Sequence, residues 1–88
     1  MEIKAGSVVL SSAGHDKGRF MLVVGADGGR VFLADGKERK LASPKKKNIR
    51  HVRATLSSIE LDGLTDKKLR QTLGKMNALP ASTLQESE

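Results

Sequence analysis

The side chains that most often carry catalysis are scarce in this sequence. Its 88 residues include no cysteine and two histidines, His15 and His51, which lie far apart. Without cysteine there is no thiolate nucleophile and no thiolate ligand for zinc or an iron–sulfur cluster, and two distant histidines make a poor metal site. The serines at 11–12 have no neighbouring acid–base partner that would activate them. We therefore expect no enzyme activity and neither a metal nor another cofactor.

Three aspartates and one glycine-rich segment could also be mistaken for functional motifs. Asp16, Asp27 and Asp35 lie in predicted turns, where an aspartate commonly accepts hydrogen bonds from the nearby backbone. Residues 25–29 match neither GxxxxGK(S/T) nor GxGxxG, and they join two predicted strands, whereas phosphate-binding loops of those types lead into a helix. We interpret these features as structural.

Positive charge is the chemical feature that stands out. The chain carries a formal net charge of +6, and residues 37–53 alone carry +7. So many like charges in a small chain repel one another, and an anionic partner would relieve that repulsion. The basic residues of this segment are Lys37, Arg39, Lys40, Lys45, Lys46, Lys47, Arg50 and Arg53.

Nucleic acid fits this charge better than a membrane surface does. A basic patch that binds lipid usually needs an apolar or lipid anchor, and the sequence has neither a lipidation signal nor a secretory leader. We therefore expect a soluble cytoplasmic protein without a membrane partner. The two aromatic residues, Phe20 and Phe32, lie in apolar predicted strands. Recognition should then depend on phosphates and shape, which favours structured RNA.

The elements that position these charges are predicted from apolar pattern and turn signals. Valine and phenylalanine are confined to residues 1–53, whereas most leucines follow residue 54. Five short strands at about ten-residue spacing predict a mainly β fold, a small barrel of about five strands with a C-terminal α-helix. The strands are expected at 7–12, 19–24, 30–34, 38–42 and 49–54, with Pro44 ending the fourth.

The second part of the chain predicts one helix, at about residues 66–77. Thr65 is a suitable N-cap, and Leu69, Leu73 and Met76 lie on one face. A helix this short is marginal in water, so we expect it to dock on the barrel, with binding of a partner protein as the alternative. This reading divides the chain into a barrel, 1–54, a linker with the docked helix, 55–80, and a disordered tail, 81–88. We expect the free protein to be a monomer.

The first part of the chain resembles a KOW motif. Residues 5–23 contain a strand, a loop with Gly14 and Gly18, and a second strand, which is how a KOW motif begins an SH3-like barrel. The continuation at 35–47, DGKERKLASPKKK, and His51 are similar to small bacterial KOW-domain RNA-binding proteins related to the archaeal and eukaryotic large-subunit ribosomal proteins of the KOW group. The resemblance covers residues 3–53.

The resemblance implies an SH3-like barrel that binds RNA, chiefly ribosomal RNA, in a ribosome-associated or translation-related role. KOW proteins commonly contact RNA through the first barrel loop, and Gly18 matches the glycine that the motif requires. Ser7 departs from the acidic residue that many KOW sequences carry. A protein-interaction adaptor and a transcription-associated KOW module remain alternatives, because NusG-type elongation factors share the motif. The expected RNA-binding residues are the eight of the basic segment together with His15, Lys17, Gly18, Arg19 and His51.

Overall fold

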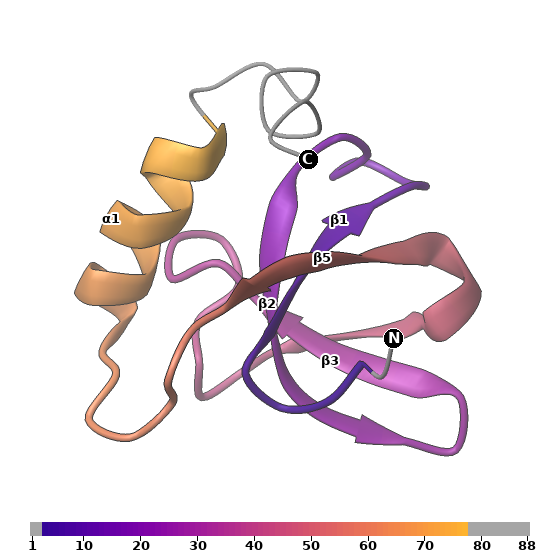
Figure 1. Cartoon of the computed structure of the whole chain (residues 1–88), viewed down its shortest axis with the longest axis horizontal. Helices are drawn as coiled ribbons and strands as arrows, with labels where there is room; N and C mark the ends of the chain where they lie inside the picture. The colour runs from indigo at the N-terminus through magenta and orange to yellow at the C-terminus, as the bar shows by residue number, and fades with distance from the viewer. Residues whose placement is uncertain (1–2, 78–88) are drawn as a thin grey trace.

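The computed structural model describes residues 3–77, in which five strands form one antiparallel sheet and a helix follows it (Figure 1). The sheet order is β4-β3-β2-β1-β5. This confirms the predicted class, a mainly β fold with five strands and a C-terminal helix. The elements are β1 (Ser7–Ser11), β2 (Phe20–Asp27), β3 (Arg30–Ala34), β4 (Lys45–Asn48), a 3-10 turn (Ile49–His51), β5 (Val52–Ser58) and α1 (Asp66–Asn77).

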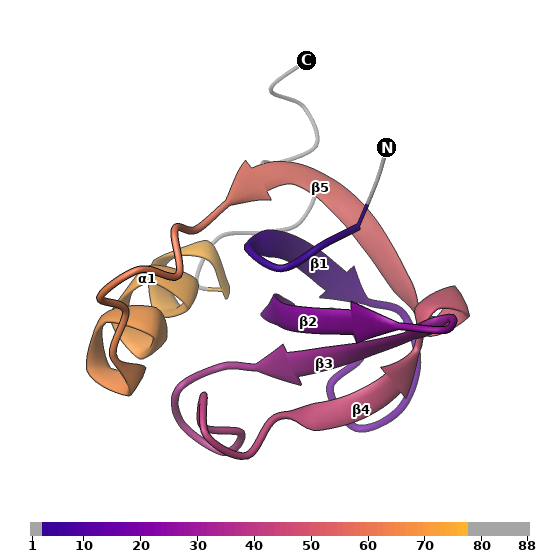
Figure 2. The same cartoon turned by 90° about the horizontal axis from the view of Figure 1, so that it is seen from below.

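The sheet is rolled because its two edge strands are neighbours in the chain. Four strand spacings of about 4.8 Å would place β4 and β5 roughly 19 Å apart in a flat sheet. The three residues of the 3-10 turn that joins them rise only about 6 Å. The two edges must therefore converge at this turn, as Figure 2 shows. The rolled sheet consequently has an inner and an outer face.

Each face of the sheet carries its own apolar cluster. The inner cluster consists of Val9, Met21, Val23, Val31, Leu33 and Val52. The outer cluster consists of Val8, Phe20, Leu22 and Ala34 together with Leu69 and Leu73 of α1. Strand β2 contributes to both clusters, which explains why its sequence is apolar on both faces. The helix thus covers the outer face as a second layer.

Helix α1 begins and ends with side chains that bond the backbone. Thr65 caps it by accepting the Lys68 N–H at 3.2 Å. In the first turn, Asp66 Oδ1 accepts the Leu41 N–H at 2.7 Å. At the last residue, Asn77 Oδ1 accepts the Phe20 N–H at 2.7 Å. The helix spans the predicted range, and its first turn is bonded to the loop before β4 and its last residue to the start of β2.

The expected fourth strand at 38–42 is wrong. Residues 35–44 form a loop, and β4 begins only after Pro44, with the sequence KKKN. Asp35 directs the loop, because its Oδ1 accepts both the Lys37 N–H at 2.8 Å and the Arg39 N–H at 2.9 Å. Leu41, within the expected strand, packs instead against the outer cluster.

Smaller differences affect the neighbouring strands. Strand β2 runs on to Asp27, which reduces the expected turn at 25–29 to two glycines. The fifth strand begins three residues later than expected and continues to Ser58, past an irregularity in its pairing with β1. The tail expected at 81–88 lies outside the described residues. Within residues 3–77, no helix has the length and apolar character to cross a bilayer.

Candidate nucleic-acid interface

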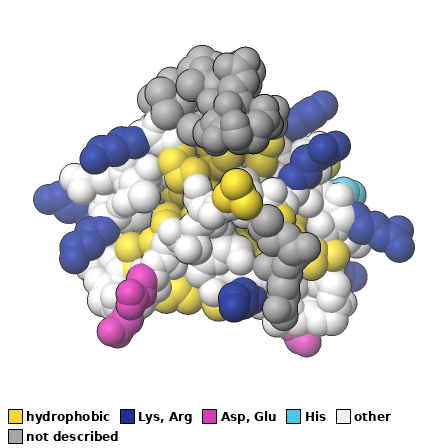
Figure 3. Space-filling view, in the orientation of Figure 1, with side chains coloured by type: hydrophobic (Ala, Val, Ile, Leu, Met, Phe, Trp, Pro, Cys, Tyr) yellow, Lys and Arg dark blue, Asp and Glu magenta, His cyan; other side chains and the backbone are white. Residues whose placement is uncertain are grey.

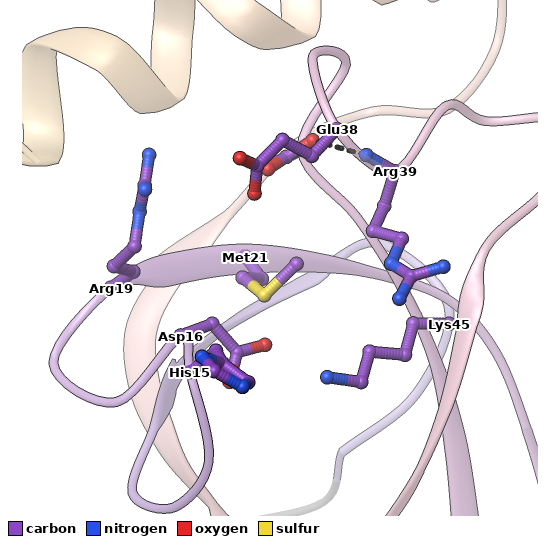
Figure 4. A pocket seen from close by; sticks show the side chains of 8 residues that line it. His15, Asp16, Arg19, Met21, Glu38, Arg39 and Lys45 are labelled. Atoms are coloured by element: carbon purple, nitrogen blue, oxygen red, sulfur yellow. Dashed lines mark hydrogen bonds between the residues drawn. The ribbon is translucent and has the colours of Figure 1, made fainter.

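Two loops that are distant in the sequence face each other across a cleft of about 220 Å³. One is the β1–β2 loop, residues 12–19, and the other is the β3–β4 loop, residues 35–44. We call this hollow the loop cleft (Figure 4). Its lining consists of His15, Asp16, Arg19, Met21, Asp35, Glu38, Arg39 and Lys45.

The loop cleft has an apolar centre and a charged rim. The Met21 side chain lies in the middle, and Arg19 and Arg39 lie on opposite sides of it (Figure 4). Lys45 extends from β4 toward His15 and Asp16, which come from the other loop. The rim thus combines cationic groups from both loops and from β4 around a buried thioether.

A second hollow of about 210 Å³ adjoins the loop cleft, because both are lined by Arg19 and Asp35. We call it the helix hollow, since α1 forms one of its sides. Its remaining lining residues are Lys37, Arg70, Leu73, Gly74 and Asn77. The two hollows together are surrounded by six basic side chains: His15, Arg19, Lys37, Arg39, Lys45 and Arg70.

The β1–β2 loop is tied to the sheet by Lys47. Its ammonium donates to Ser11 Oγ at 2.7 Å, to the Ala13 carbonyl at 2.6 Å and to Asp16 Oδ1 at 2.6 Å. The three donors of the ammonium are therefore all used, and the Lys47 side chain is 7% exposed. Lys47 belongs to β4, so the contact bridges the sheet edge and the loop.

Two sequence-based expectations are corrected by this contact. Lys47 was expected on the exposed RNA-binding surface, but its inward position and its ion pair remove its charge from that surface. Asp16 was interpreted as an aspartate bonding its local backbone, but its Oδ1 accepts from Ser11 Oγ as well as from Lys47. A charged pair 31 positions apart in sequence replaces the local turn interaction.

The ion pair changes the acidity of Asp16. Partial burial alone would raise the pKa of this carboxyl, since it disfavours the charged form. Hydrogen bonds from Lys47 and Ser11 and the charges of Lys47 and Lys45 outweigh burial, so the pKa lies below its ordinary 3.8. Asp16 is therefore ionised at neutral pH and compensates the charge of Lys47 within the loop.

The β3–β4 loop is held by the backbone and side chains of α1. Gly36 has φ of +79°, and a Cβ added to it would lie 2.3 Å from the Asp66 carbonyl oxygen. Glycine is required here both for the backbone conformation and for the close approach to the helix. Arg70 Nη1 donates to the Gly36 carbonyl at 3.4 Å, and Asp66 accepts from Leu41 farther along the loop.

The fold brings together only part of the expected RNA-binding set. Five of its residues line the two hollows, namely His15, Arg19, Lys37, Arg39 and Lys45. Lys17, Gly18 and Lys40 are exposed elsewhere on the same two loops. The remaining exposed members lie on other elements: Lys46 on β4, Arg50 and His51 on the 3-10 turn, and Arg53 on β5.

Positive charge is consequently spread around the molecule. Lys and Arg side chains project around the outline in Figure 3, with few acidic side chains among them. Strand geometry separates consecutive lysines, because Lys46 points outward where Lys45 and Lys47 point inward. What distinguishes the two hollows is the concave arrangement of their charges.

Eight lining residues of the two hollows were not among the site residues predicted from the sequence: Asp16, Met21, Asp35, Glu38, Arg70, Leu73, Gly74 and Asn77. Glu38 could have been singled out from the sequence, since it is the one acidic residue within 37–53. No sequence feature pointed to Arg70, because it lies outside the basic segment and reaches the loops only when α1 docks. Across the described residues, no cluster of three or more His, Cys, Asp or Glu side chains is placed to hold a metal ion.

The comparisons with known proteins add no family to this description. No protein-family model matches the chain, and no curated protein matches it.

Proposed function

We propose that the chain binds structured RNA, with ribosomal RNA as the class that the KOW resemblance suggests. The observation that carries this proposal is the meeting of two loops around adjoining hollows with six basic side chains on their rims. Guanidinium and ammonium groups pair with phosphate oxygens through charge-assisted hydrogen bonds, and concave placement lets several of them contact one folded backbone.

The way the loops are held supports tight binding. The Lys47 contacts fix one loop, and the Asp66 and Gly36 contacts fix the other. Loops that are ordered before binding lose little conformational entropy when the partner arrives, so more of the interaction energy contributes to affinity.

The position of the aromatic residues supports folded RNA over unstructured single strands. Phe20 is buried under α1, and Phe32 is half-buried on β3. Binders of single-stranded nucleic acid usually stack successive bases on exposed aromatic rings. This chain would instead contact phosphates and 2′-hydroxyls, which are the groups that a folded RNA displays.

The test compares two variants that lose the same number of charges. One replaces Arg19, Arg39 and Lys45 with Gln and so neutralises the loop cleft. Its matched control replaces Arg30, Lys46 and Arg53 with Gln, all of which lie outside the two hollows. Affinity for a fluorescent ribosomal RNA hairpin is measured by anisotropy at several salt concentrations.

We expect the cleft variant to bind at least about tenfold more weakly and the control to lose less than about threefold. Contact with about six phosphates predicts that log K falls with log salt at a slope of roughly −4 to −5, and the cleft variant should flatten this slope by about 2 to 3. Equal losses in both variants would contradict the proposed location. Absence of measurable binding by the parent would contradict the function.

A further inference from the structure

We infer that the loop cleft accepts a single unstacked base of the bound RNA and favours guanine. This inference rests on the proposed function and adds a base preference to it. It begins from the mixed chemistry of the lining, which joins a thioether, two guanidinium groups and the exposed carboxylate of Glu38 in one cleft.

Two features of the cleft do not suit a phosphate alone. The Met21 side chain forms an apolar centre, which offers nothing to a phosphate oxygen (Figure 4). Glu38 is exposed on the rim, where its negative charge would repel a phosphate. A nucleobase matches both features, because it combines apolar faces with a polar edge.

The cleft also supplies surfaces for stacking. Bases extruded from RNA stack on guanidinium planes as well as on aromatic rings. Arg19 and Arg39 are exposed and lie on opposite sides of Met21, so a base above the thioether would lie between two guanidinium-bearing side chains (Figure 4). Lys45 and His15 then remain on the rim for the phosphate of the same nucleotide.

Glu38 is the carboxylate that can read the base edge. Asp16 Oδ1 already accepts from Lys47 and Ser11, and Asp35 Oδ1 accepts two backbone N–H groups of its own loop. A carboxylate offers two neighbouring acceptors, and guanine presents two neighbouring donors, N1–H and the 2-amino group. Uracil has only one donor, N3–H, between two carbonyl acceptors, so a carboxylate pairs with it less well.

The experiment uses the full chain and five hairpin RNAs that differ only in one bulged nucleotide. The bulge is guanosine, inosine, adenosine, cytidine or uridine, and affinity is measured by fluorescence anisotropy at one salt concentration. Inosine tests the contact directly because it lacks only the 2-amino group of guanosine. The variants are Glu38→Gln and a matched control, Glu60→Gln, which removes the same charge from an exposed residue of the β5–α1 connection.

We expect the guanosine hairpin to bind at least about fivefold more tightly than the uridine hairpin, as for a bidentate base contact. Inosine should lose most of that advantage. Glu38→Gln should bring guanosine down to the uridine level, whereas Glu60→Gln should strengthen all five hairpins slightly and equally.

Two results would overturn the inference and leave the proposed function standing. One is equal affinity for all five hairpins with uniform strengthening by Glu38→Gln, which would make the cleft a phosphate site. The other is a preference for a base other than guanine. If no hairpin binds the parent protein, the proposed function is overturned together with the inference.

Discussion

The β1–β2 loop and the β3–β4 loop face each other across the cleft, but different interactions hold them. The first is tied by a charged side chain of the sheet, Lys47, which reaches Asp16 and Ser11. The second is pressed against the helix, with Gly36 close to the Asp66 carbonyl. One side of the cleft therefore depends on an ion pair, and the other depends on apolar docking of α1. Substitutions that break the Lys47 contacts and substitutions that prevent α1 from docking should therefore affect different loops.

The largest effect is expected when α1 can no longer dock. Leu69 and Leu73 are 0% and 1% exposed, and each Leu→Ala change should cost about 2–5 kcal/mol of unfolding free energy. Leu69→Ala combined with Leu73→Ala would then remove roughly 4–10 kcal/mol, comparable to the whole stability of a small domain. Thermal unfolding followed by circular dichroism should show a protein that is unfolded or melts far below the parent.

Leu56→Ala is the matched control for that pair. Leu56 is 86% exposed, so its truncation should change the free energy of unfolding by less than about 0.5 kcal/mol. If the double variant melted like the control, α1 would not contribute to the stability of the sheet, and the helix would not be what holds the β3–β4 loop.

Breaking the ion pair is expected to have the next largest effect. Lys47→Met keeps much of the apolar stem but leaves the Asp16 carboxylate without its cation, which should cost about 2–4 kcal/mol. Lys46→Met, one position away and exposed, should cost less than about 0.5 kcal/mol. Urea unfolding of both variants measures the difference.

A double-mutant cycle sharpens this prediction. Combining Lys47→Met with Asp16→Asn should cost at least about 1 kcal/mol less than the sum of the single changes, because the contact can be lost only once. Strict additivity would show that the two side chains do not stabilise each other.

Gly36→Ala should act on the helix-supported side with a smaller effect. The residue has positive φ, and the new methyl group would also meet the Asp66 carbonyl, so we expect a cost of about 2–3 kcal/mol. Gly28→Ala shares the positive φ but has no atom within 4 Å of the added Cβ, so about 1 kcal/mol is expected. Equal costs in urea unfolding would mean that the close approach of loop and helix is unimportant.

The smallest effect is a pH dependence confined to the ion-paired side. The pKa of Asp16 is lower in the folded protein than its ordinary 3.8, so the unfolded chain binds its proton first as the pH falls. The contribution of Asp16 to stability is therefore complete above about pH 5 and disappears as the pH falls through the lowered pKa. The stability gap between the parent and Asp16→Asn should be constant from pH 5 to 8 and narrow below pH 4. An equal gap at pH 2 and pH 7 would contradict the ion-pair assignment.

The sequence predicts the strands whose side chains follow the usual apolar pattern. β1, β2 and β3 carry both phenylalanines and five of the six valines, and hairpin glycines separate β2 from β3. β4 could not be found in this way because KKKN contains no apolar residue. Its inner face is built from lysine stems, and Lys47 is buried only because Asp16 and Ser11 receive its ammonium. That compensation depends on contacts between distant residues, which no local pattern contains.

The candidate site was predictable in charge but not in arrangement. The basic segment was identified because Lys and Arg concentrate there, and the first loop was identified through the resemblance to a KOW motif. The meeting of Arg19 with Arg39 and Lys45 follows from the roll of the sheet, and the contribution of Arg70 follows from helix docking. Lys45 and Lys47 point inward and Lys46 points outward. This difference follows from the limits of β4, which the sequence pattern does not reveal.

The bonds between Asn77 and Phe20 bear on how the protein is made. They join residues 57 positions apart, and Leu69 and Leu73 complete the same apolar cluster from the end of the described chain. During synthesis, the strands emerge from the ribosome first and must wait for α1 before their outer face is covered. Contacts of such long sequence separation slow folding, and a sheet with an uncovered apolar face is prone to aggregate in the interval. The helix therefore determines when the nascent chain becomes both stable and able to form its loop cleft.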